Sequence, residues 1–325
     1  MDYKMIAKIY NINVTSTLNK GKFIDDDNMR LSNSLATFNR LFDNEKFART
    51  IGFLEFDSLR NSTYMYQTGE LKQLQETFKN HQIMGEANYY YINSFLRKID
   101  IFMVALWLVK DHSVNIESGF IGTGTKEDFY SVTSSNTAFL SSKSNGLINE
   151  TMFSIEEINK AIQYYKLLHP EINLNIGNQI ADGPYKVKSL RVPRAFYFLQ
   201  AARHETDVPV KIMKYCTILE CLFTTGRDEI THKISERFAR LMSEQLEQRE
   251  YYFSLVKKSY AIRSTVIHGQ SMSEKRYAAA LELAIELDNA IRELLLKIVL
   301  DSDFEKNFEQ NEEDLEKWFR QLILS

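Results

Sequence analysis

The sequence predicts a mainly α protein, and three observations support this. The 325 residues include only 4 Pro and 12 Gly, which is typical of a chain with much helix and few long loops. Capping residues and helical spacing of apolar residues dominate from Ser154 onward. Before residue 150 the patterns are mixed. We therefore expect a mixed, mostly helical N-terminal region (1–150), a helical bundle (151–301), and an acidic stretch with an amphipathic helix (302–325).

The N-terminal region contains one clear helical pattern and one strand pattern. Apolar residues in the segment 84–109 are spaced to form one helix face: Phe95, Ile99, Phe102, Met103 and Leu106. The alternation at 129–132 predicts one or two strands. Residues 141–146, SSKSNG, are typical of a linker. The run Tyr89, Tyr90, Tyr91 favours buried packing over the stacking of bases.

Six helices are predicted after the linker. Ser154 and Glu157 form a capping box that opens a helix through Leu168. The other five span about 193–204, 208–224, 228–245, 249–267 and 273–300, with Asp228 as an N-cap and Gly269 as a terminator. Beyond the acidic stretch, a short amphipathic helix carries its apolar side on Leu315, Trp318, Phe319, Leu322 and Ile323.

Composition limits the classes of function. The net charge is -3, and eight carboxylates lie between Asp301 and Glu316, so contact with RNA requires a local basic patch. Cys216 and Cys221 are the only cysteines, which suits a reducing compartment and disfavours a thiolate metal site. The longest apolar run, 101–109, is too short to span a membrane, and residues 1–16 lack a secretory pattern. We expect a cytoplasmic protein without metal, cofactor or membrane contact.

One charged residue breaks the apolar stripe of the 249–267 helix. With Leu255 at zero on a helical wheel, Arg263 falls near 80°, inside the stripe formed by Ile262, Val266 and Val256, whereas Ser264 and Thr265 fall on the opposite side. A guanidinium cannot lose its charge and is rarely buried without a partner. Three explanations stay open: an intramolecular carboxylate, a partner subunit, or a cleft that receives a phosphate.

Two further residues offer partners for this arginine. Glu220 lies on the almost wholly apolar 208–224 helix, where it needs a cation such as Arg263 or Arg237. His268 closes the helix five residues after Arg263, and Gly269 lets the backbone turn there. A helix-terminal His is most often a cap. Together, however, an Arg that binds phosphate and a His that moves protons suffice to cut RNA without a metal.

The segment Tyr260–Gly269, YAIRSTVIHG, is similar to the R-x4-6-H signature of the HEPN superfamily, and most of all to its Apea-like branch. Residues 218–223 and 229–237 also resemble that branch. HEPN domains are four- to five-helix bundles that usually dimerise around one cleft, and many are metal-independent endoribonucleases of toxin–antitoxin, abortive-infection and CRISPR systems. The resemblance implies phosphate binding by Arg263, proton transfer or transition-state stabilisation by His268, and organisation of the pair by Glu220.

The chain departs from the family pattern at two positions. Many HEPN motifs have Asn, Asp or His after the Arg, where this chain has Ser264, a residue found in the Apea-like branch. Toxins modified by a nucleotidyltransferase carry Tyr two residues after the His, where this chain has Gln270. The resemblance therefore implies a nuclease that is not controlled by that modification.

The leading hypothesis is a bacterial homodimeric endoribonuclease that acts in anti-phage defence or as a toxin, with the N-terminal region as trigger sensor, restraint or RNA selector. Candidate RNA-approach residues are His232, Lys233, Arg240, Lys257 and Lys258. One rival is a non-catalytic HEPN module for dimerisation or nucleotide binding, which predicts that Arg263 and His268 are both buried. A second is a structural helical adaptor, which predicts an Arg263–Glu220 ion pair and no basic cleft.

Overall fold

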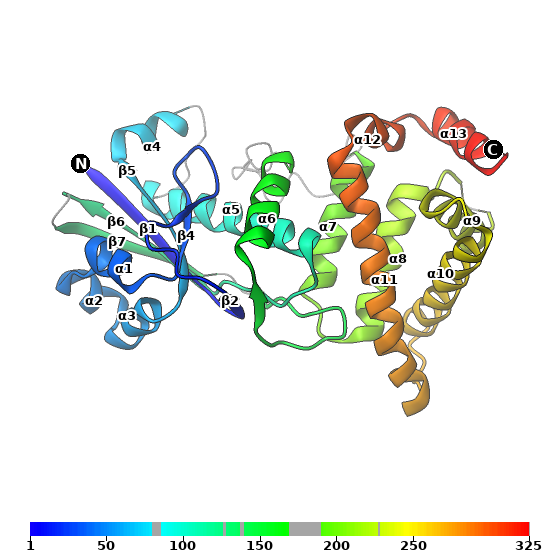
Figure 1. The fold of residues 1–325 in the computed structure, drawn as a ribbon, viewed down its shortest axis with the longest axis horizontal. Helices are drawn as coiled ribbons and strands as arrows, with labels where there is room; N and C mark the ends of the chain where they lie inside the picture. Colours follow the sequence, from blue (N-terminus) through cyan, green and yellow to red (C-terminus); the bar gives the residue numbers. More distant parts are fainter. Residues whose placement is uncertain (80–85, 126–127, 137–139, 169–189, 227, 325) are drawn as a thin grey trace. The chain divides into compact units, whose positions relative to one another are not determined.

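The chain forms two compact units in a computed structural model that describes residues 1–79, 86–125, 128–136, 140–168, 190–226 and 228–324 (Figure 1). The first unit comprises Met1–Leu140 and Asn149–Ala181, and the second comprises Ser141–Ile148 and Asp182–Ser325. The short segment 141–148 therefore belongs to the second unit although both of its neighbours in sequence belong to the first. The described chain is mainly helical, as predicted.

The first unit is built on a six-stranded antiparallel sheet of order β3-β4-β5-β1-β6-β7. Its strands are β1 (Asp2–Ile9), β3 (Lys22–Phe23), β4 (Arg30–Ser32), β5 (Thr63–Glu70), β6 (Ser118–Gly124) and β7 (Phe129–Asn136). A separate parallel pair joins β2 (Ile12–Val14) to β8 (Thr151–Phe153). The strand predicted at 129–132 is confirmed within β7, whereas the long central strands β1 and β5 were not predicted.

Each face of this sheet carries its own core because side chains alternate along a strand. Met5 and Met65 pack on one face with helix α5 (Ala87–Val109), while Ile6 packs on the other. That second face is covered by α1 (Leu35–Phe42), α2 (Glu45–Ile51) and α3 (Phe53–Arg60). Helix α4 (Leu71–Thr77) contributes Leu74 to the core on the α5 side. The helix predicted over 84–109 is confirmed, with Tyr90 and Tyr91 buried and Tyr89 exposed.

The domain boundary expected at residue 150 needs correction. The predicted capping box is present, since Ser154 and Glu157 open helix α6 (Ile155–Leu167). However, Ile158, Ala161 and Tyr165 of this helix pack in the same core as α5, so α6 belongs to the first unit. The amphipathic pattern of α6 predicted a helix correctly but carried no information about which core it joins.

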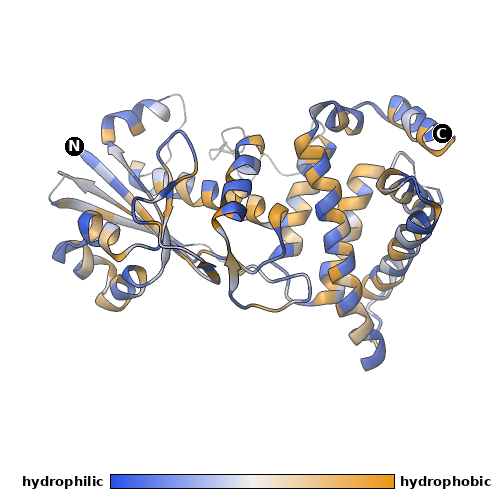
Figure 2. Cartoon of the chain, viewed as in Figure 1, coloured by the Kyte–Doolittle hydropathy of each residue, from blue (hydrophilic) through white to orange (hydrophobic). Residues whose placement is uncertain are grey.

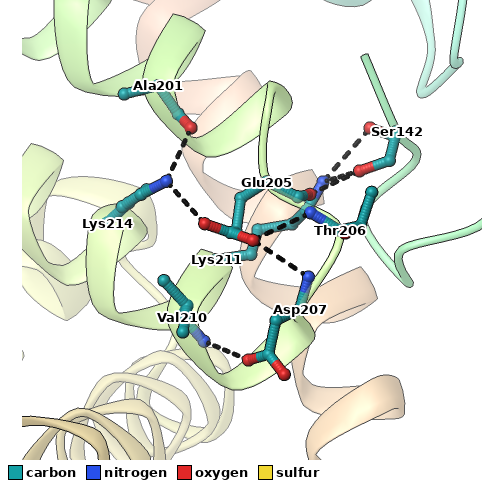
Figure 3. A network of polar contacts seen from close by, with 8 residues as sticks. All are labelled: Ser142, Ala201, Glu205, Thr206, Asp207, Val210, Lys211 and Lys214. Atoms are coloured by element: carbon teal, nitrogen blue, oxygen red, sulfur yellow. Dashed lines mark hydrogen bonds and ion pairs between the residues drawn. The ribbon is translucent and has the colours of Figure 1, made fainter. Parts of the chain in front are cut away.

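The predicted linker 141–146 is also wrong, because its serines are buried. Ser141, Ser142 and Ser144 have almost no exposed surface. Lys211 of α8 (Val208–Phe223) is fully buried and its ammonium donates to Ser142 Oγ at 2.8 Å, Ser142 O at 3.1 Å and Lys143 O at 2.7 Å (Figure 3). A buried ammonium needs such partners. Ser142 also donates through its N–H to Arg203 O at 2.8 Å and through its hydroxyl to Glu205 O, so several hydrogen bonds fix the segment to the second unit.

The turn between α7 (Arg191–Arg203) and α8 is held by acidic side chains beside this lysine (Figure 3). Asp207 caps α8 by accepting from Val210 N at 3.0 Å. Glu205 accepts from the backbone N–H groups of Thr206 and Asp207 and pairs with Lys214 Nζ at 2.8 Å. Backbone and side-chain hydrogen bonds thus fix where α8 begins.

His204, the last residue before this turn, should make the stability of the fold depend on pH. Burial, together with the nearby charges of Arg203, Lys214 and Lys211, lowers the pKa of His204 from 6.5 to about 4. Between these two pH values His204 is therefore protonated in the unfolded chain but neutral in the folded chain. The free energy of unfolding should fall as the pH drops from 6.5 towards 4. Urea unfolding at about pH 7 and about pH 5 should show a smaller loss for His204→Gln than for wild type. An identical loss in both proteins would contradict this assignment.

The second unit is a helical bundle centred on α8. The other helices are α7, α9 (Ile230–Met242), α10 (Leu246–Ile267), α11 (Glu274–Leu300), α12 (Ser302–Phe308) and α13 (Glu312–Leu324). Helix α8 packs against α7, α9, α10 and α11; one side of it is buried, including Ile212, Cys216 and Leu219, and its other residues are partly buried. Its hydrophobic character and the hydrophilic sides of α10 and α11 are visible in Figure 2. The helices predicted here are confirmed to within a few residues, although α9 is preceded by Glu229, in a left-handed conformation, and not by a capping Asp228.

The predicted C-terminal amphipathic helix is α13, and it docks on the bundle. Leu315 and Phe319 are fully buried, with the Phe319 ring 5.6 Å from that of Phe223. The acidic stretch before it is not a single loop but contains α12, whose N-cap is Asp301. Asp301 thus caps α12, while Glu312, Glu313 and Asp314 occupy the first turn of α13.

Candidate functional site

The candidate site begins with three side chains from α8 and α10 of the second unit. Arg263 Nη2 lies 3.0 Å from Glu220 Oε1, and the hydroxyl of Tyr260 donates to the same oxygen at 3.2 Å. Tyr260 and Arg263 meet the same carboxylate because residues three apart share one side of a helix. The guanidinium also lies over the Tyr260 ring, with its carbon 5.5 Å from the ring centre. Glu220 thus receives two donors from one helix.

The electrostatics of this cluster are those of a partly buried site. The Arg263 side chain is 29% exposed and that of Glu220 is 24% exposed, so the pair is neither surface nor core. Burial and then the negative charge of Glu220 raise the pKa of Tyr260, which keeps its proton for donation. Burial likewise raises the pKa of the Cys216 thiol on the neighbouring turn of α8, so this cysteine is neutral at physiological pH.

Arg263 has unused hydrogen-bonding capacity. A guanidinium has five N–H donors, and here only Nη2 donates to a partner within the described chain. Its Nε is buried and has no hydrogen-bond partner among the described residues. A partly exposed cation held from one side by a carboxylate retains donors for a second anion.

His268 lies at the C-terminus of α10 and is exposed. Gly269 at φ 62° turns the chain, and its N–H donates to Val266 O while that of Gln270 donates to Thr265 O, both at 3.0 Å. These two bonds form a Schellman motif. Within the described ranges, the imidazole makes no hydrogen bond or ion pair, so the structure does not bring the side chains of His268 and Arg263 into direct contact.

The wheel prediction for α10 is wrong at one residue beside the motif. Thr265 was placed on the polar side, yet it is 3% exposed and its hydroxyl accepts from Arg276 Nη2 of α11 at 2.7 Å. Arg276 also donates to Ala261 O at 3.1 Å. Helix α11 therefore covers a side of α10 that the periodicity assigned to solvent. Ser264 is exposed as predicted, and its carbonyl accepts from His268 N.

Arg237, proposed from the sequence as an alternative partner of Glu220, has a different function. It is 3% exposed, and its Nη2 pairs with Glu316 of α13 at 2.6 Å. Its Nη1 donates to Phe223 O at 2.7 Å and to Thr225 Oγ1 at 3.0 Å, and its guanidinium lies over the Phe319 ring. Arg237 therefore anchors α13 to the bundle and does not support the Arg263 pair.

The five candidate RNA-approach residues differ in how exposed their side chains are and in whether those side chains make other contacts. Lys257 and Lys258 are exposed on α10, and His232 of α9 is exposed with its ring against Phe253, which Lys257 also approaches. Arg240 donates through Nε to Leu322 O at 2.9 Å, so part of its guanidinium supports α13. Lys233 is half-buried. Three of the five thus keep fully exposed side chains.

Two residues near the motif were missed by the sequence analysis. Tyr260 was given no role, although its spacing of three from Arg263 could have indicated a shared partner. Arg276 contacts Thr265 only through the packing of α11 on α10. No local sequence pattern indicates that contact.

Comparison with protein-family models, with curated proteins and with solved structures finds no match to this chain. In the part of the chain that the structure describes, no helix is long and apolar enough to cross a membrane. Among the same residues, no group of three or more His, Cys, Asp or Glu side chains is arranged to hold a metal ion.

Proposed function

We propose that the second unit is a HEPN-like, metal-independent endoribonuclease whose catalytic residues are Arg263 and His268. The observation that carries this proposal is the partly exposed Arg263 guanidinium, oriented from one side by Glu220, on the helix that ends in exposed His268. Two buried side chains would have favoured the non-catalytic module, whereas Arg263 is partly exposed and His268 is exposed. The sequence resemblance around residues 260–269 supplies the reaction class.

The reaction is a transfer of phosphate within the RNA strand. The ribose 2′-oxygen attacks the adjacent phosphorus and forms an O–P bond while the bond from phosphorus to the 5′-oxygen breaks. His268 takes part in moving the 2′-hydroxyl proton or protonating the leaving 5′-oxygen. Arg263 stabilises the charge that develops on the phosphoryl oxygens. The products are a 2′,3′-cyclic phosphate and a 5′-hydroxyl.

In this proposal Glu220 and Tyr260 are positioning residues. Their contacts with each other and with Arg263 hold the guanidinium in one orientation before phosphate arrives, which reduces the entropy lost on binding. The proposed active unit is a homodimer in which both copies of the motif face one cleft, so that a second Arg263 adds to the positive field. We also propose that the protein acts in anti-phage defence or as a toxin, with the first unit as sensor or regulator.

The experiment is cleavage of a labelled RNA by purified protein in excess EDTA. We expect cleavage to continue, because the proposed reaction needs only Arg263 and His268, and to leave 2′,3′-cyclic phosphate and 5′-hydroxyl ends. End groups are identified by their reaction with a 3′-phosphatase and a 5′-kinase. Activity that is lost in EDTA and restored by Mg²⁺, or products with 5′-phosphate ends, would refute the mechanism.

A structural adaptor is the second candidate function, and the Arg263–Glu220 ion pair favours it. This pair is what a purely structural bundle would use to neutralise two partly buried charges. The two proposals differ in one respect that can be measured. An adaptor has no reason to cut RNA, whereas the nuclease must lose its activity when His268 is replaced.

A further inference from the structure

The first unit contains a cavity that the proposed nuclease does not use. Its volume is about 630 Å³, which lies within the range of small-molecule sites. The cavity lies between the α5 face of the sheet and helices α4, α5 and α6, so it belongs wholly to the first unit. Tyr3 and Met5 come from β1, Gln67 from β5, and Ser94 and Lys98 from α5.

The inner wall of this cavity is aromatic. Five rings line it, and all are buried: Tyr3, Phe78, Tyr91, Phe95 and Tyr165. Phe78 and Tyr91 lie with their centroids 5.4 Å apart. Buried rings that border an open volume provide flat surfaces on which another aromatic ring can stack.

Two buried polar groups on the wall lack partners. Ser94 is 2% exposed and lines the cavity, yet its hydroxyl makes no hydrogen bond within the described chain. Gln67 is 5% exposed, and its Nε2 donates to the Tyr3 hydroxyl at 3.0 Å while its Oε1 accepts from no described residue. Polar atoms that line a cavity without a protein partner can bond to a ligand that carries both donors and acceptors, or to water.

The charges in the cavity nearly balance, since three carboxylates and two ammonium groups line it: Asp25, Asp26, Asp27, Lys98 and Lys166. Lys98 of α5 pairs with Asp27 and lies 3.6 Å from Asp25, whose carboxylate also accepts from Met29 N and from the Tyr165 hydroxyl. Burial raises the pKa of Asp25 despite the nearby Lys98, which indicates that this end of the cavity is poorly hydrated. A paired lysine is a weak site for a polyphosphate, and carboxylates already paired with a lysine are weak sites for a polyamine. The cavity therefore suits an uncharged ligand rich in hydrogen-bonding groups.

We propose that this cavity binds a nucleoside, whose flat heterocycle stacks on the aromatic wall while its ribose hydroxyls donate to the carboxylates of Asp25 and Asp27. Ser94 and Gln67 then contact the polar edge of the base. A nucleoside meets all three features together, because it joins a ring to a vicinal diol and carries no charge. This site is independent of Arg263 and His268, so either proposal can fail without the other.

The test uses the full chain, labelled with ¹³C at methionine methyl groups and titrated with adenosine, guanosine, cytidine or uridine. The Met5 signal, assigned by comparison with Met5→Leu, should shift saturably with at least one nucleoside, while that of Met242 in α9 should not. The 2′-deoxy form of the same nucleoside should bind at least about threefold more weakly, since one hydroxyl contact is lost.

Variants then locate the site. Ser94→Ala and Asp27→Asn should each weaken nucleoside binding at least about threefold. Two controls should leave nucleoside binding unchanged: Ser134→Ala, at an exposed residue of β7 outside the cavity, and His268→Ala. The proposal is overturned if no nucleoside shifts Met5 at millimolar concentration, or if Ser94→Ala and Asp27→Asn bind like wild type. It is equally overturned if spermidine or inorganic phosphate shifts Met5 as strongly as any nucleoside.

Discussion

Replacing Arg263 with Met is expected to reduce RNA cleavage at least about 100-fold, because the substitution removes the only charge assigned to stabilise the transition state. Arg249→Met is the matched control: it lies on the same helix, and its guanidinium donates to Ser243 O at 2.7 Å, away from Glu220. The control should cleave within about twofold of wild type. Single-turnover rates on one RNA measure both variants. Wild-type rates for Arg263→Met would contradict the assignment.

The same variant tests the proposed dimer. Two Arg263 side chains that face each other across a shared cleft repel, so Arg263→Met should keep or tighten the dimer while abolishing cleavage. Apolar residues of α10 such as exposed Ile267 are available for the interface. Light scattering or sedimentation on wild type and variant gives the oligomeric state. A strictly monomeric wild-type protein that still cuts RNA would refute the shared cleft.

Replacing His268 with Ala is expected to reduce cleavage at least about 100-fold, the typical contribution of a general acid or base. Stability should change by no more than about 0.5 kcal/mol, since the side chain is exposed and the backbone bonds of the Schellman motif remain. Glu282→Ala is the control, because Glu282 is an exposed residue of α11 in the same bundle and has no role in the proposed site. The three proteins are compared by cleavage rate and by thermal unfolding. Equal rates for wild type and a folded His268→Ala protein would exclude His268 from catalysis.

Much of the second unit could be predicted from the sequence because its information is local. Helical spacing of apolar residues and Gly269 as a terminator act within a few residues, and the helices form within a few residues of where those signals place them. The Arg263–Glu220 pair was among the open explanations for the same reason. Each residue is a charge on an otherwise apolar part of its helix, and two opposite charges of this kind in one bundle can pair with each other.

The sheet of the first unit could not be predicted in the same way. β1 and β5 pair across more than fifty residues, which no local pattern reports. β5 is buried on both faces over Thr63–Gln67 and shows no alternation. β1, in contrast, alternates four apolar residues with mostly polar neighbours, a signal that went unused: Tyr3, Met5, Ala7 and Ile9. α6 illustrates a related limit, since its apolar face fits either core and the choice depends on packing against α5. Long-range packing also decided the partners of Arg237, Thr265 and Lys211, which no local pattern contains.

The central claim is that this chain cuts RNA through Arg263, and sequencing of RNA 5′ ends in cells tests it most directly. Cells that express wild type are compared with cells that express Arg263→Ala at equal protein levels, with ends cloned so that 5′-hydroxyl termini are distinguished. We expect new 5′-hydroxyl ends that accumulate with wild type and are absent with the variant. The same set of ends in both samples, or none in either, would contradict it.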